Sequence, residues 1–586
     1  MSDPTNLEIA AALDELGDLY ELDGAIIHRV VAYRNGAKAV RDASASVAAL
    51  ARAGRATELP GIGETLQAKL RDLVETGDIP AAVKLRAKFP PGLVAMTRIP
   101  GLGPKRARVL HAELGIDSPE ALQAAAERQE IRGLKGFGPK AEENILAGLA
   151  QLAAAGGAGQ ARVLLDRALA VGEPIVAALR AHPAAERVEL AGSARRMADT
   201  VKDLDVIATA SDPAALIAAL AEIEEIDTVT SSGEAGARAR THAGLGVDLR
   251  VVAPEQFGSL LQHFTGSKEH NMALREAAVR RGLHVSEYGI LDDADGQTHP
   301  CATEEEVYER LGYDWIEPEL RENRGELEAA AAGGASLPAL VTLADIRGDL
   351  HAHTVASDGH ATIEEMARAA AARGYEYLAI TDHSASHGFG DDVSPAQLRR
   401  QIGKVRKADA AIGGIRILAG TEVNILPDGS LDYDDALLAQ LDWVVASVHT
   451  SFRMGSDAMT ERMIAAIGHP GVDAIGHPTG RMLGKRPGYA VDLEAVIAAA
   501  AQAGTMLEIN ANPNRRDLDD VHARAAAAAG VPIVIDSDAH RTETLAVMRF
   551  GVATARRAWL GPGEVANTRS WADLQALRKP GRRRDA

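Results

Sequence analysis

From residue 345 onward the chain alternates apolar strands with alanine-rich helical stretches, and most of these strands end in His, Asp or Glu. The seven strand ends read GDLHAH, YLAITDH, ILAGTE, WVVASVH, DAIGH, MLEINAN and VIDSDAH. Seven alternations of this kind predict a β/α barrel, in which reactive side chains gather at the carboxyl ends of the strands. The pattern therefore predicts the fold of the second half and the end of the barrel that carries its chemistry.

Histidine placement indicates a metal site at those strand ends. Ten of the 18 histidines lie at or after His351, and most of them end a predicted strand. Nitrogen and oxygen donors without a thiol suit Zn²⁺, Mn²⁺ or Fe²⁺ in a cluster of about two or three ions, with Glu422 as a bridge. Such a cluster would lower the pKa of a bound water and hold a phosphoester for hydrolysis. Lone histidines such as His469 and His522 are better interpreted as surface or helix-capping residues.

Length, charge and cysteine content narrow the class of protein. A chain of 586 residues is too long for one hydrophobic core, so we expect several domains. The net charge of −19 argues against a nucleic-acid partner, but residues 1–160 carry 19 Lys and Arg against 20 Asp and Glu, so the acidity lies mostly in the later domains. The single cysteine, Cys301, fits a reducing cytoplasm. We find no signal-peptide pattern and no apolar run of the ~18 residues that a membrane span needs, so a cytoplasmic protein without a membrane segment is expected.

Three segments share a hydrophobic-x-Gly-x-Gly core followed by a helix: LPGIGETLQAKL (59–70), IPGLGPKRARVL (99–110) and LKGFGPKAEENIL (134–146). Two glycines permit a tight turn that presents backbone N–H groups at a helix N-terminus, where a phosphate oxygen can bind. Nearby cations add charge without reading base identity. One copy would be interpreted as a helix–helix turn, whereas three copies predict binding to the DNA backbone. The residues predicted to bind DNA are Gly61, Gly63, Gly101, Gly103, Lys105, Gly136, Gly138 and Lys140.

A second constellation begins with GSARRMADTVKDLDV at Gly192. Asp203 and Asp205 are two positions apart on a predicted strand and therefore share a face, and GVDLRVV places Asp248 on another strand. Asp-x-Asp alone is a common surface-strand pattern, but three carboxylates behind a Gly-Ser-x-Arg-Arg turn can hold Mg²⁺ or Mn²⁺ ions that activate a 3′-hydroxyl and stabilise pyrophosphate. Contacts to a nucleoside triphosphate are expected from the turn, through Gly192, Ser193 and Arg196.

With these motifs, residues 1 to about 325 resemble a family X DNA polymerase, the gap-filling repair class, and residues 345–575 resemble a PHP (polymerase and histidinol phosphatase) domain. The resemblance implies a multidomain α/β protein with an N-terminal helical helix-hairpin-helix domain, an α+β nucleotidyltransferase palm with a thumb, and a C-terminal distorted β/α barrel. The implied boundaries are 1–90 for the helical DNA-binding domain, 91–158 for a fingers-like region, 159–255 for the palm, 256–325 for the thumb, 326–344 for a linker and 345–575 for the barrel.

The resemblance also implies residue roles in the first half. Asp203, Asp205 and Asp248 match the catalytic aspartates of the family. Within HFTGSKEHNMALREAAVRRGLHVSEYGI (263–290), the implied roles are a sugar-contacting turn at Phe264 and Gly266, a minor-groove contact to the nucleotide from Asn271, and a template contact from Arg275. His263 stands where several relatives have Tyr. Lys69 lies where some relatives keep a 5′-deoxyribose-phosphate lyase lysine, and it is equally consistent with a plain phosphate contact. Around the lyase site we expect His28, Tyr33 and Arg34.

For the barrel, the match implies the ligands His351, His353, Asp358, His383, Glu422, His449, His477, Asp538 and His540. His360 competes with Asp358 for one of these positions. Weaker candidates for orienting a substrate phosphate are His387, Arg481 and Lys485.

The expected function is template-directed DNA synthesis by a two-metal mechanism together with a metal-dependent 3′→5′ exonuclease or phosphoesterase, acting on gapped or nicked DNA with deoxynucleoside triphosphates. Mg²⁺ or Mn²⁺ is expected in the palm and Zn²⁺ or Mn²⁺ in the barrel, and the chain is expected to be a monomer. Abasic-site endonuclease and lyase activities are further possibilities. The alternative is a DNA-binding protein with an inert palm, whose PHP domain hydrolyses small phosphomonoesters such as histidinol phosphate.

Overall fold

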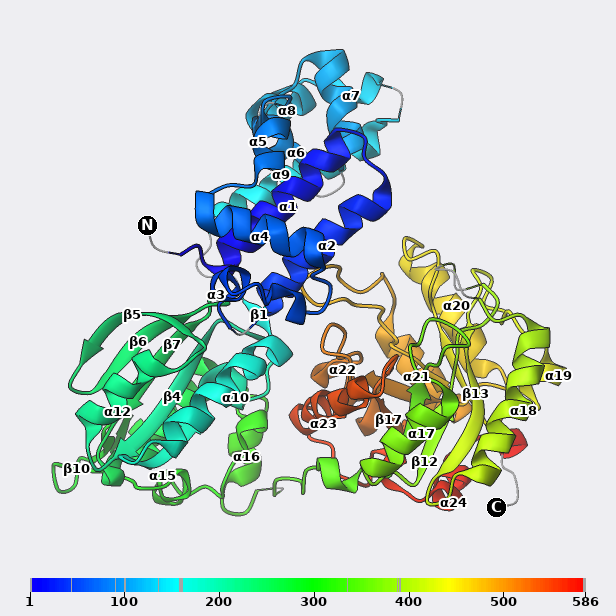
Figure 1. The fold of residues 1–586 in the computed structure, drawn as a ribbon. Helices are drawn as coiled ribbons and strands as arrows, with labels where there is room; N and C mark the ends of the chain where they lie inside the picture. The colour runs from blue at the N-terminus through cyan, green and yellow to red at the C-terminus, as the bar shows by residue number, and fades with distance from the viewer. Residues whose placement is uncertain are drawn as a thin grey trace. The chain divides into compact units, whose positions relative to one another are not determined.

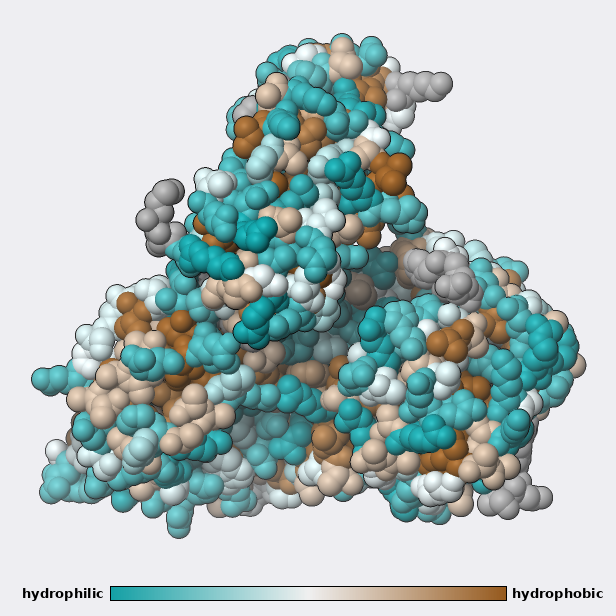
Figure 2. Space-filling view, viewed as in Figure 1, coloured by the Kyte–Doolittle hydropathy of each residue, from teal (hydrophilic) through white to brown (hydrophobic). Residues whose placement is uncertain are grey.

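The computed structural model describes residues 3–43, 45–89, 91–97, 99, 102–134, 136–157, 162–334, 336–386, 388 and 392–582. The chain forms two compact units (Figure 1). Unit 1 comprises Met1–Val163, Arg167–Leu190 and Lys202–Phe257, and unit 2 comprises Leu164–Asp166, Ala191–Val201 and Gly258–Ala586. The face seen in Figure 2 is mostly hydrophilic, with apolar side chains in small separate patches. Among the helices that the structure describes, none has the length and apolar character to cross a membrane.

The N-terminal part of unit 1 is helical, as expected. Its helices are α1 (Asn6–Leu22), α2 (Ile27–Asp42), α3 (Val47–Arg52), α4 (Glu64–Thr76), α5 (Pro80–Arg86), α6 (Pro91–Thr97), α7 (Pro104–Leu114), α8 (Pro119–Glu127) and α9 (Pro139–Gly157). Thr5 and Glu8 form a capping box that starts α1, and Gly77, with φ of +82°, ends α4. Buried residues from Ile9 to Leu149 form one core. This core continues across the domain boundary expected at residues 90 and 91.

The rest of unit 1 is a five-stranded sheet in the order β2 (Ala185–Leu190), β4 (Asp203–Ala210), β7 (Gly246–Val251), β6 (Gly236–Thr241) and β5 (Ile226–Gly233). Strands β4 and β7 are parallel, and the other neighbours are antiparallel. The helix α10 (Leu165–Ala181) packs closely on β4, because a Cβ at Gly172 would lie 3.1 Å from Leu204. A further helix is α12 (Pro213–Ala219). The sequence predicted the strands that carry Asp203, Asp205 and Asp248, which are β4 and β7, but not the β5–β6 hairpin.

The two-residue strand β1 (Val163–Leu164) lies where the chain first passes from unit 1 to unit 2. The next segment of unit 2 contains the short elements α11 (Gly192–Arg195) and β3 (Thr200–Val201). A small α+β region follows, with α13 (Phe257–Thr265), α14 (Lys268–Val279), the antiparallel strands β8 (Leu283–Ser286), β9 (Gly289–Asp292) and β10 (Gln297–His299), and α15 (Glu304–Arg310). Its core includes fully buried Tyr308, whose hydroxyl lies 2.9 Å from His270 Nε2.

The segment expected to be a linker, 326–344, differs from that expectation at its start. Glu326–Ala330 forms the helix α16, and the Glu326 side chain is fully buried. Its carboxylate lies 2.7 Å from His270 Nδ1 and accepts hydrogen bonds from the backbone N–H groups of Asn323 and Arg324. The start of the segment therefore packs against the preceding region, because the buried carboxylate of Glu326 is hydrogen-bonded there.

The remainder of unit 2 is a parallel β/α barrel, which confirms the predicted fold. Its seven strands are neighbours in chain order: β11 (Gly348–Ala352), β12 (Tyr377–Ile380), β13 (Arg416–Asn424), β14 (Trp443–Ser447), β15 (Ala474–Ile475), β16 (Met506–Asn510) and β17 (Ile533–Asp536). Beyond the last strand, Ala539 bridges to Ala352 in parallel, and its carbonyl accepts a hydrogen bond from His353 N at 2.8 Å. The sheet is therefore nearly closed.

Helices cover the outside of the barrel (Figure 1). They are α17 (Ile363–Ala372), α18 (Pro395–Ala411), α19 (Asp435–Leu438), α20 (Ser456–Gly468), α21 (Leu493–Ala503), α22 (Asp520–Ala528) and α23 (Met548–Arg557), whereas α24 (Trp571–Leu577) packs against the core inside the barrel. Capping boxes start α17 at Thr362 and α18 at Ser394. A second core, separate from the one under these helices, joins alternate strand residues such as Leu418, Val445 and Val534 to Leu574 of α24. Alternate residues of a strand share a face, so this core fills the inside of the barrel.

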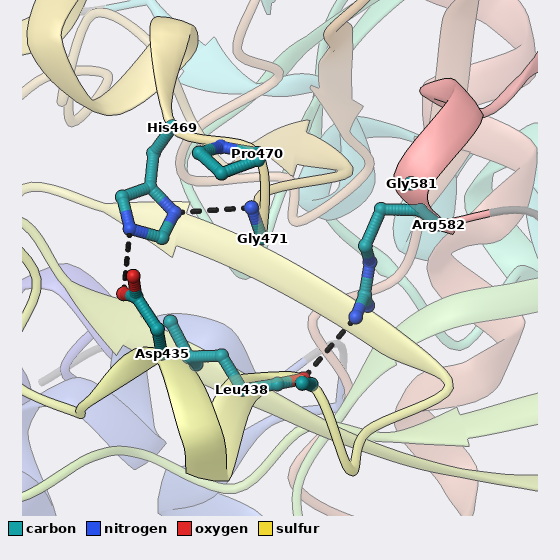
Figure 3. A pocket seen from close by; sticks show the side chains of 8 residues that line it. Asp435, Leu438, His469, Pro470, Gly471, Gly581 and Arg582 are labelled. Atoms are coloured by element: carbon teal, nitrogen blue, oxygen red, sulfur yellow. Dashed lines mark hydrogen bonds and ion pairs between the residues drawn. The ribbon is translucent and has the colours of Figure 1, made fainter.

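The C-terminal segment closes the amino-terminal end of the barrel. Asp473, which precedes β15, is fully buried and lies 2.8 Å from Arg578 Nε and 2.7 Å from Arg582 Nη2. Arg582 also donates to the Leu438 carbonyl beside a hollow of about 220 Å³. Figure 3 shows His469 beside this hollow, with hydrogen bonds to the Asp435 side chain and to the backbone N–H of Gly471. These residues precede the strands, so the hollow lies at the end opposite the predicted metal site.

Replacing Asp473 tests this closure. In Asp473→Ala, Arg578 and Arg582 stay buried without their carboxylate, and we expect the free energy of unfolding of unit 2 to fall by about 3–5 kcal/mol. Tryptophan fluorescence in a urea titration measures this unit, because it contains all four tryptophans: Trp315, Trp443, Trp559 and Trp571. Asp435→Ala removes an exposed carboxylate from the same end and should leave the midpoint nearly unchanged. Equal losses in the two variants would contradict the assignment.

Candidate metal centres and nucleotide site

Three aspartates of unit 1 lie on adjacent parallel strands. Asp203 and Asp205 occupy β4, Asp248 occupies β7, and Asp205 is directly paired with Asp248 in the sheet register. Asp203 and Asp205 are both half-buried while Leu204 between them is fully buried, so the two carboxylates share the accessible face. The strands thus place the three aspartates that the sequence singles out at neighbouring positions of the sheet, although their oxygens are not among the metal-donor groups found in the described part of the chain.

Positive side chains already surround Asp248. Arg238 Nε lies 3.2 Å from its Oδ2, and Arg250 Nε lies 2.9 Å from its Oδ1. A hollow of about 380 Å³ beside the sheet is lined by Asp203, Arg238 and Asp248. Carboxylate oxygens that gather at an open hollow and attract cations are the donors that Mg²⁺ and Mn²⁺ prefer. The chemistry of this donor set therefore fits the metals that the sequence predicts.

The predicted triphosphate-binding turn lies in unit 2, where Gly192 has a φ of +65° and begins α11. Arg196, just after α11, donates to the Thr265 carbonyl and places its Nε 3.1 Å from Glu322 Oε1. A Cβ on Gly266 would come within 3.0 Å of Arg196 Nη1, and φ at Gly266 is +69°. The absence of a side chain at Gly266 therefore lets the guanidinium lie against the turn that was predicted to contact the sugar. Ser193 lies in the same helix, and Phe264 precedes this turn.

Asn271 and Arg275 on α14 both contact His263. Asn271 Nδ2 donates to the His263 carbonyl at 2.8 Å, and Arg275 Nη2 lies 3.1 Å from His263 Nδ1. Burial lowers the pKa of His263, and the nearby Arg275 charge lowers it further. A neutral ring that accepts at Nδ1 suits the arginine donor. His263 therefore orients two of the residues that the sequence assigns to nucleotide and template contacts.

The helix-hairpin-helix glycines have the geometry expected of phosphate-binding turns. Gly61 and Gly136 have φ values of +87° and +90°, and Gly63 and Gly103 immediately precede α4 and α7. Among the described residues, no atom lies within 4 Å of an added Cβ at any of these positions, nor at Gly138. Exposed cations follow at Lys105 and Lys140. Gly101 lies outside the described residues.

Lys69 is half-buried on α4. The residues expected around a lyase site lie on α2: His28, Tyr33 and Arg34. Two of them are engaged with α1, because Tyr33 stacks on Tyr20 with ring centroids 5.2 Å apart and Arg34 pairs with Glu21 at 2.6 Å. The lyase role of Lys69 stays a prediction.

Glu422 lies at the centre of a polar cluster at the carboxyl end of the barrel. Its side chain is buried, and Oε1 lies 3.1 Å from His449 Nε2 and 2.9 Å from His477 Nε2. Its other oxygen, Oε2, faces three further imidazoles: His383 Nδ1 at 2.8 Å, His351 Nε2 at 3.4 Å and His353 Nε2 at 3.6 Å. One carboxylate whose two oxygens face separate sets of imidazoles has the arrangement of a bridging ligand.

Donor atoms of the cluster form three groups in which all atoms lie within 4.8 Å of one another: His353, Asp358, His383 and His540; His351, His353 and Asp538; and His383, Glu422 and His449. His353 and His383 each belong to two groups, so neighbouring ions could share ligands. Several buried atoms lack a hydrogen bond within the described residues, namely His351 Nε2, both ring nitrogens of His353 and Glu422 Oε2. Such atoms are costly to bury alone, and metal ions would satisfy them. The residues therefore fit a metal cluster.

Burial and neighbouring charges shift the pKa values of these side chains in different directions. Burial lowers the pKa of His353 to about 3, with repulsion from His540 and His383 acting in the same direction, so its ring is neutral at physiological pH and can donate a lone pair. Burial also lowers the pKa of His540, but Asp358 outweighs this and raises it to about 9. Burial raises the pKa of Glu422, yet the imidazoles around it, led by His449, hold it well below the usual range.

The structure separates Asp358 from its competitor His360. Asp358 Oδ1 lies 3.5 Å from His383 Nε2 and its Oδ2 lies 3.2 Å from His540 Nε2, whereas the His360 side chain is exposed and belongs to none of the donor groups found among the described residues. Asp382 beside His383 has a different role. It accepts hydrogen bonds from Thr354 and Ser357, and so holds the loop that carries Asp358. His387 lies outside the described residues.

Two residues near the cluster were missed by sequence reasoning. Glu508 in the middle of β16 lies 2.6 Å from His351 Nδ1, so it fixes which ring nitrogen faces the cluster. The sequence signal for Glu508 was the presence of a charged residue inside the otherwise mostly apolar segment MLEIN. Arg515 Nε lies 3.7 Å from Asp538 Oδ2 and carries positive charge to the cluster edge. Of the weaker candidates for phosphate contacts, Lys485 is exposed and Arg481 pairs with Asp199 at 3.0 Å.

Four segments match known domain families. Residues 4–79 match a helix-hairpin-helix domain, residues 94–151 a SAM-like helix-hairpin-helix tandem, residues 260–322 the DNA polymerase beta thumb and residues 349–512 the PHP domain.

Similar proteins match almost the whole chain or about a third of it. The DNA polymerase/3′-5′ exonuclease PolX of Bacillus subtilis is 37% identical over 574 residues, which are 98% of this chain and 99% of that protein. A "Probable phosphatase" of Thermoanaerobacter sp. is 34% identical over 38% of this chain and 89% of its own length. Another "Probable phosphatase", from Acetivibrio thermocellus, is 36% identical over 33% of this chain and 78% of its own length.

Two nearby substitutions distinguish the candidate ligand from the exposed histidine. Asp358→Ala removes a donor shared with His383 and His540, and we expect the purified protein to lose about one equivalent of bound transition metal, because four donors normally hold such an ion. His360→Ala should bind as much metal as the unmodified chain. Elemental analysis of both variants after the same purification measures the difference. Metal loss in His360→Ala but not in Asp358→Ala would reverse the assignment.

Proposed function

This chain belongs to the family X DNA polymerases that carry a PHP domain, and we propose that it is a gap-filling DNA polymerase with a metal-dependent 3′→5′ exonuclease in its barrel. The observation that carries the proposal is the similarity to the Bacillus subtilis DNA polymerase/3′-5′ exonuclease, because it spans 98% of this chain and therefore includes both candidate active sites. The carboxylates of β4 and β7 and the histidine cluster of the barrel supply a plausible centre for each activity.

Nucleotidyl transfer is assigned to Asp203, Asp205 and Asp248. Mg²⁺ or Mn²⁺ held by these carboxylates would supply the charge that promotes attack of a primer 3′-hydroxyl on the α-phosphorus and departure of pyrophosphate. Adjacent parallel strands hold the carboxylates at fixed spacing, so little reorganisation is needed when substrate binds. Their positions on rigid strands rather than on loops support this role.

Contacts to the incoming nucleotide are assigned to the turn and thumb residues. Gly192 and Ser193 would offer backbone and hydroxyl donors to the triphosphate, and Arg196 a guanidinium. The sugar contacts are assigned to Phe264 and Gly266, and contacts to the nucleotide base and the template to Asn271 and Arg275. His263, which holds both of the last two, would couple the sugar and template contacts.

Gapped or nicked DNA is the proposed partner. The open glycine turns of the helix-hairpin-helix region, Gly61, Gly63, Gly103, Gly136 and Gly138, together with Lys105 and Lys140, would bind phosphates without reading sequence. Gly101 is assigned the same role from the sequence motif alone. We propose that residues 1–90 and 91–158 form this DNA-binding region, 159–255 the palm, 256–325 the thumb and 345–575 the nuclease barrel. We further infer a cytoplasmic monomer, in keeping with a single, buried cysteine.

The barrel is assigned to phosphodiester hydrolysis from a 3′ end. Zn²⁺ or Mn²⁺ ions held by the cluster would supply the Lewis acidity that hydrolysis of a phosphodiester requires. The proposed ligands are His351, His353, Asp358, His383, Glu422, His449, His477, Asp538 and His540. Arg515, at the edge of the cluster, is placed to attract the phosphate of the scissile bond.

A second candidate activity for the barrel is hydrolysis of small phosphomonoesters. It is favoured by the similarity to two proteins named "Probable phosphatase", each of which matches the barrel over most of its own length. Abasic-site endonuclease activity would use the same metal cluster on a different phosphodiester. All three activities share one chemistry, so only the substrate distinguishes them.

Variants in the two candidate centres should separate the two activities. On one gapped duplex with deoxynucleoside triphosphates, Asp203→Ala/Asp205→Ala should lower extension by at least ~10³-fold and leave degradation of a 3′-labelled strand intact, because metal-charge stabilisation is lost in the palm alone. His351→Ala should do the reverse. An unmodified chain that adds no nucleotides would refute the polymerase assignment.

The same preparations resolve the substrate of the barrel. Turnover of the 3′-labelled strand is compared with turnover of histidinol phosphate and of a duplex with one abasic site, with His351→Ala as the blank. Preference for histidinol phosphate would replace the exonuclease assignment by the phosphatase one.

Lys69 is proposed as a lyase nucleophile. Incubation with a 5′-deoxyribose-phosphate end and borohydride should trap a covalent adduct with the unmodified chain, because reduction fixes the Schiff base of an amine nucleophile. Lys69→Ala should give no adduct and still bind DNA, while Lys84→Ala on α5 serves as the matched lysine control. Equal trapping by Lys69→Ala would leave Lys69 as a phosphate contact only.

A further inference from the structure

The turn that carries the proposed triphosphate contacts belongs to the compact unit of the barrel. Residues Ala191–Val201 group with Gly258–Ala586, although the strands on either side of the turn, β2 and β4, belong to unit 1. The contacts that hold the turn in unit 2 include those of two arginines of the barrel, Arg516 and Arg557. Neither belongs to the proposed catalytic groups of either site.

Arg516 holds the end of the turn. It is 1% exposed, and its Nη1 donates to the Met197 carbonyl at 2.9 Å and lies 3.0 Å from Asp199 Oδ1. Met197 and Arg516 both have positive φ values, +55° and +46°, in the left-handed region that disfavours side chains. Strained backbone persists only where its surroundings enforce it, so this contact is part of what fixes the turn. Arg481 adds a second pairing to Asp199, at 3.0 Å.

Arg557 holds Arg196 itself. Its Nη1 donates to the Arg196 carbonyl at 3.0 Å and to Glu322 Oε1 at 2.8 Å. The same Glu322 oxygen accepts from Arg196 Nε at 3.1 Å. Arg557 therefore fixes the backbone of Arg196 directly and its guanidinium through a shared carboxylate. Arg557 is 9% exposed and is itself held by Asp520 at 2.9 Å.

The contacts of Arg557 with Glu322 and Arg196 are costly to break because the charged groups are buried. Removing one member of a buried ion pair leaves the other without compensation in a poorly hydrated place, so the remaining groups move to find new partners. If Arg557 is removed, Glu322 keeps only Arg196, and the Arg196 carbonyl loses its donor. The guanidinium that is assigned to the triphosphate would then be drawn toward Glu322.

We propose that Arg557 and Arg516 are positioning residues of the polymerase site, through which the barrel fixes the turn with Gly192, Ser193 and Arg196 and so sets the affinity for the incoming nucleoside triphosphate. The inference rests on the proposed polymerase function. It makes the barrel a structural part of nucleotide binding, in addition to a separate hydrolase.

Arg557 is the better residue for a test, because Arg516 follows Arg515, which reaches the metal cluster. In the full chain, Arg557→Ala should raise the KM for the nucleoside triphosphate on gapped DNA roughly tenfold, the size of coupling expected between contacting residues, and should leave kcat within about twofold. Exonuclease activity of the same preparation should be unchanged. Arg557→Lys, which keeps the charge, should recover part of the affinity.

A matched control is Arg347→Ala, which breaks an exposed arginine–glutamate pair of the same barrel, with Glu376, and should leave the KM unchanged. An Arg557→Ala variant with intact exonuclease activity and an unchanged KM would overturn the inference. A fall in kcat alone would overturn it too, because a merely structural defect lowers the active fraction of the enzyme without changing KM.

If Arg557→Ala loses exonuclease activity as well, misfolding has occurred and Asp199→Asn decides the question. It weakens the same network from the turn, and the same rise in KM is expected, whereas an unchanged KM overturns the inference. Absence of extension by the unmodified chain contradicts the proposed polymerase function and is thereby distinguished from failure of this inference.

Discussion

A single buried carboxylate, Glu422, determines how the carboxyl end of the barrel can be organised. Its two oxygens face imidazoles from four strand ends, so the charge of one side chain draws together segments that are far apart in the sequence. Burying such a charge in an apolar interior is costly unless it is paired. The alternation of the strands meets this requirement, because inward apolar residues such as Leu418 and Val445 are followed four positions later, on the same faces, by Glu422 and His449 of the polar cluster.

The two candidate centres use the same principle with different partners. In the palm, carboxylates on parallel strands face arginines and an open hollow, which suits hard cations and a large charged substrate. In the barrel, imidazoles replace arginines and the site is more deeply buried, which suits ions that prefer nitrogen. The turn near Arg196 groups with the unit of the barrel, because its backbone and its guanidinium are both held by side chains of unit 2.

Much of the fold was predictable because period-two alternation and helix caps are local signals. All seven barrel strands have apolar runs that end in a polar group, and the structure confirms them. The β5–β6 hairpin was missed because TVTSSG is mostly polar and β6 buries only small side chains such as Ala237 and Ala239, so the hairpin is stabilised by its neighbours in the sheet. The helix α16 was missed because its composition resembles a linker, and only the distant His270 explains why Glu326 is buried.

From the sequence, the residues of the site could be predicted only by their type and by their position at the end of a strand. Spacing placed Asp358 and His360 in one loop but could not say which side chain turns inward, because that depends on hydrogen bonds from the loop to Asp382. Glu508 was missed because it lies inside a strand rather than at its end, and its partner His351 is 157 positions away. The roles of Arg516 and Arg557 were likewise invisible in sequence, since each pairs with a residue more than two hundred positions distant.

The closure of the amino-terminal end of the barrel by the C-terminal segment has a consequence for folding during synthesis. The inside of the barrel is completed by Trp571 and Leu574, and Asp473 pairs with Arg578 and Arg582, which follow it by 105 and 109 positions. The first strand, β11, also needs groups near β17, such as Asp536, for its backbone hydrogen bonds. Domains fold as their residues emerge from the ribosome, so the helical core of residues 9–149 can form early. The barrel can be complete only after residues 571–582 have been added, and its metal ions can meet their complete set of proposed ligands only after His540 has been made.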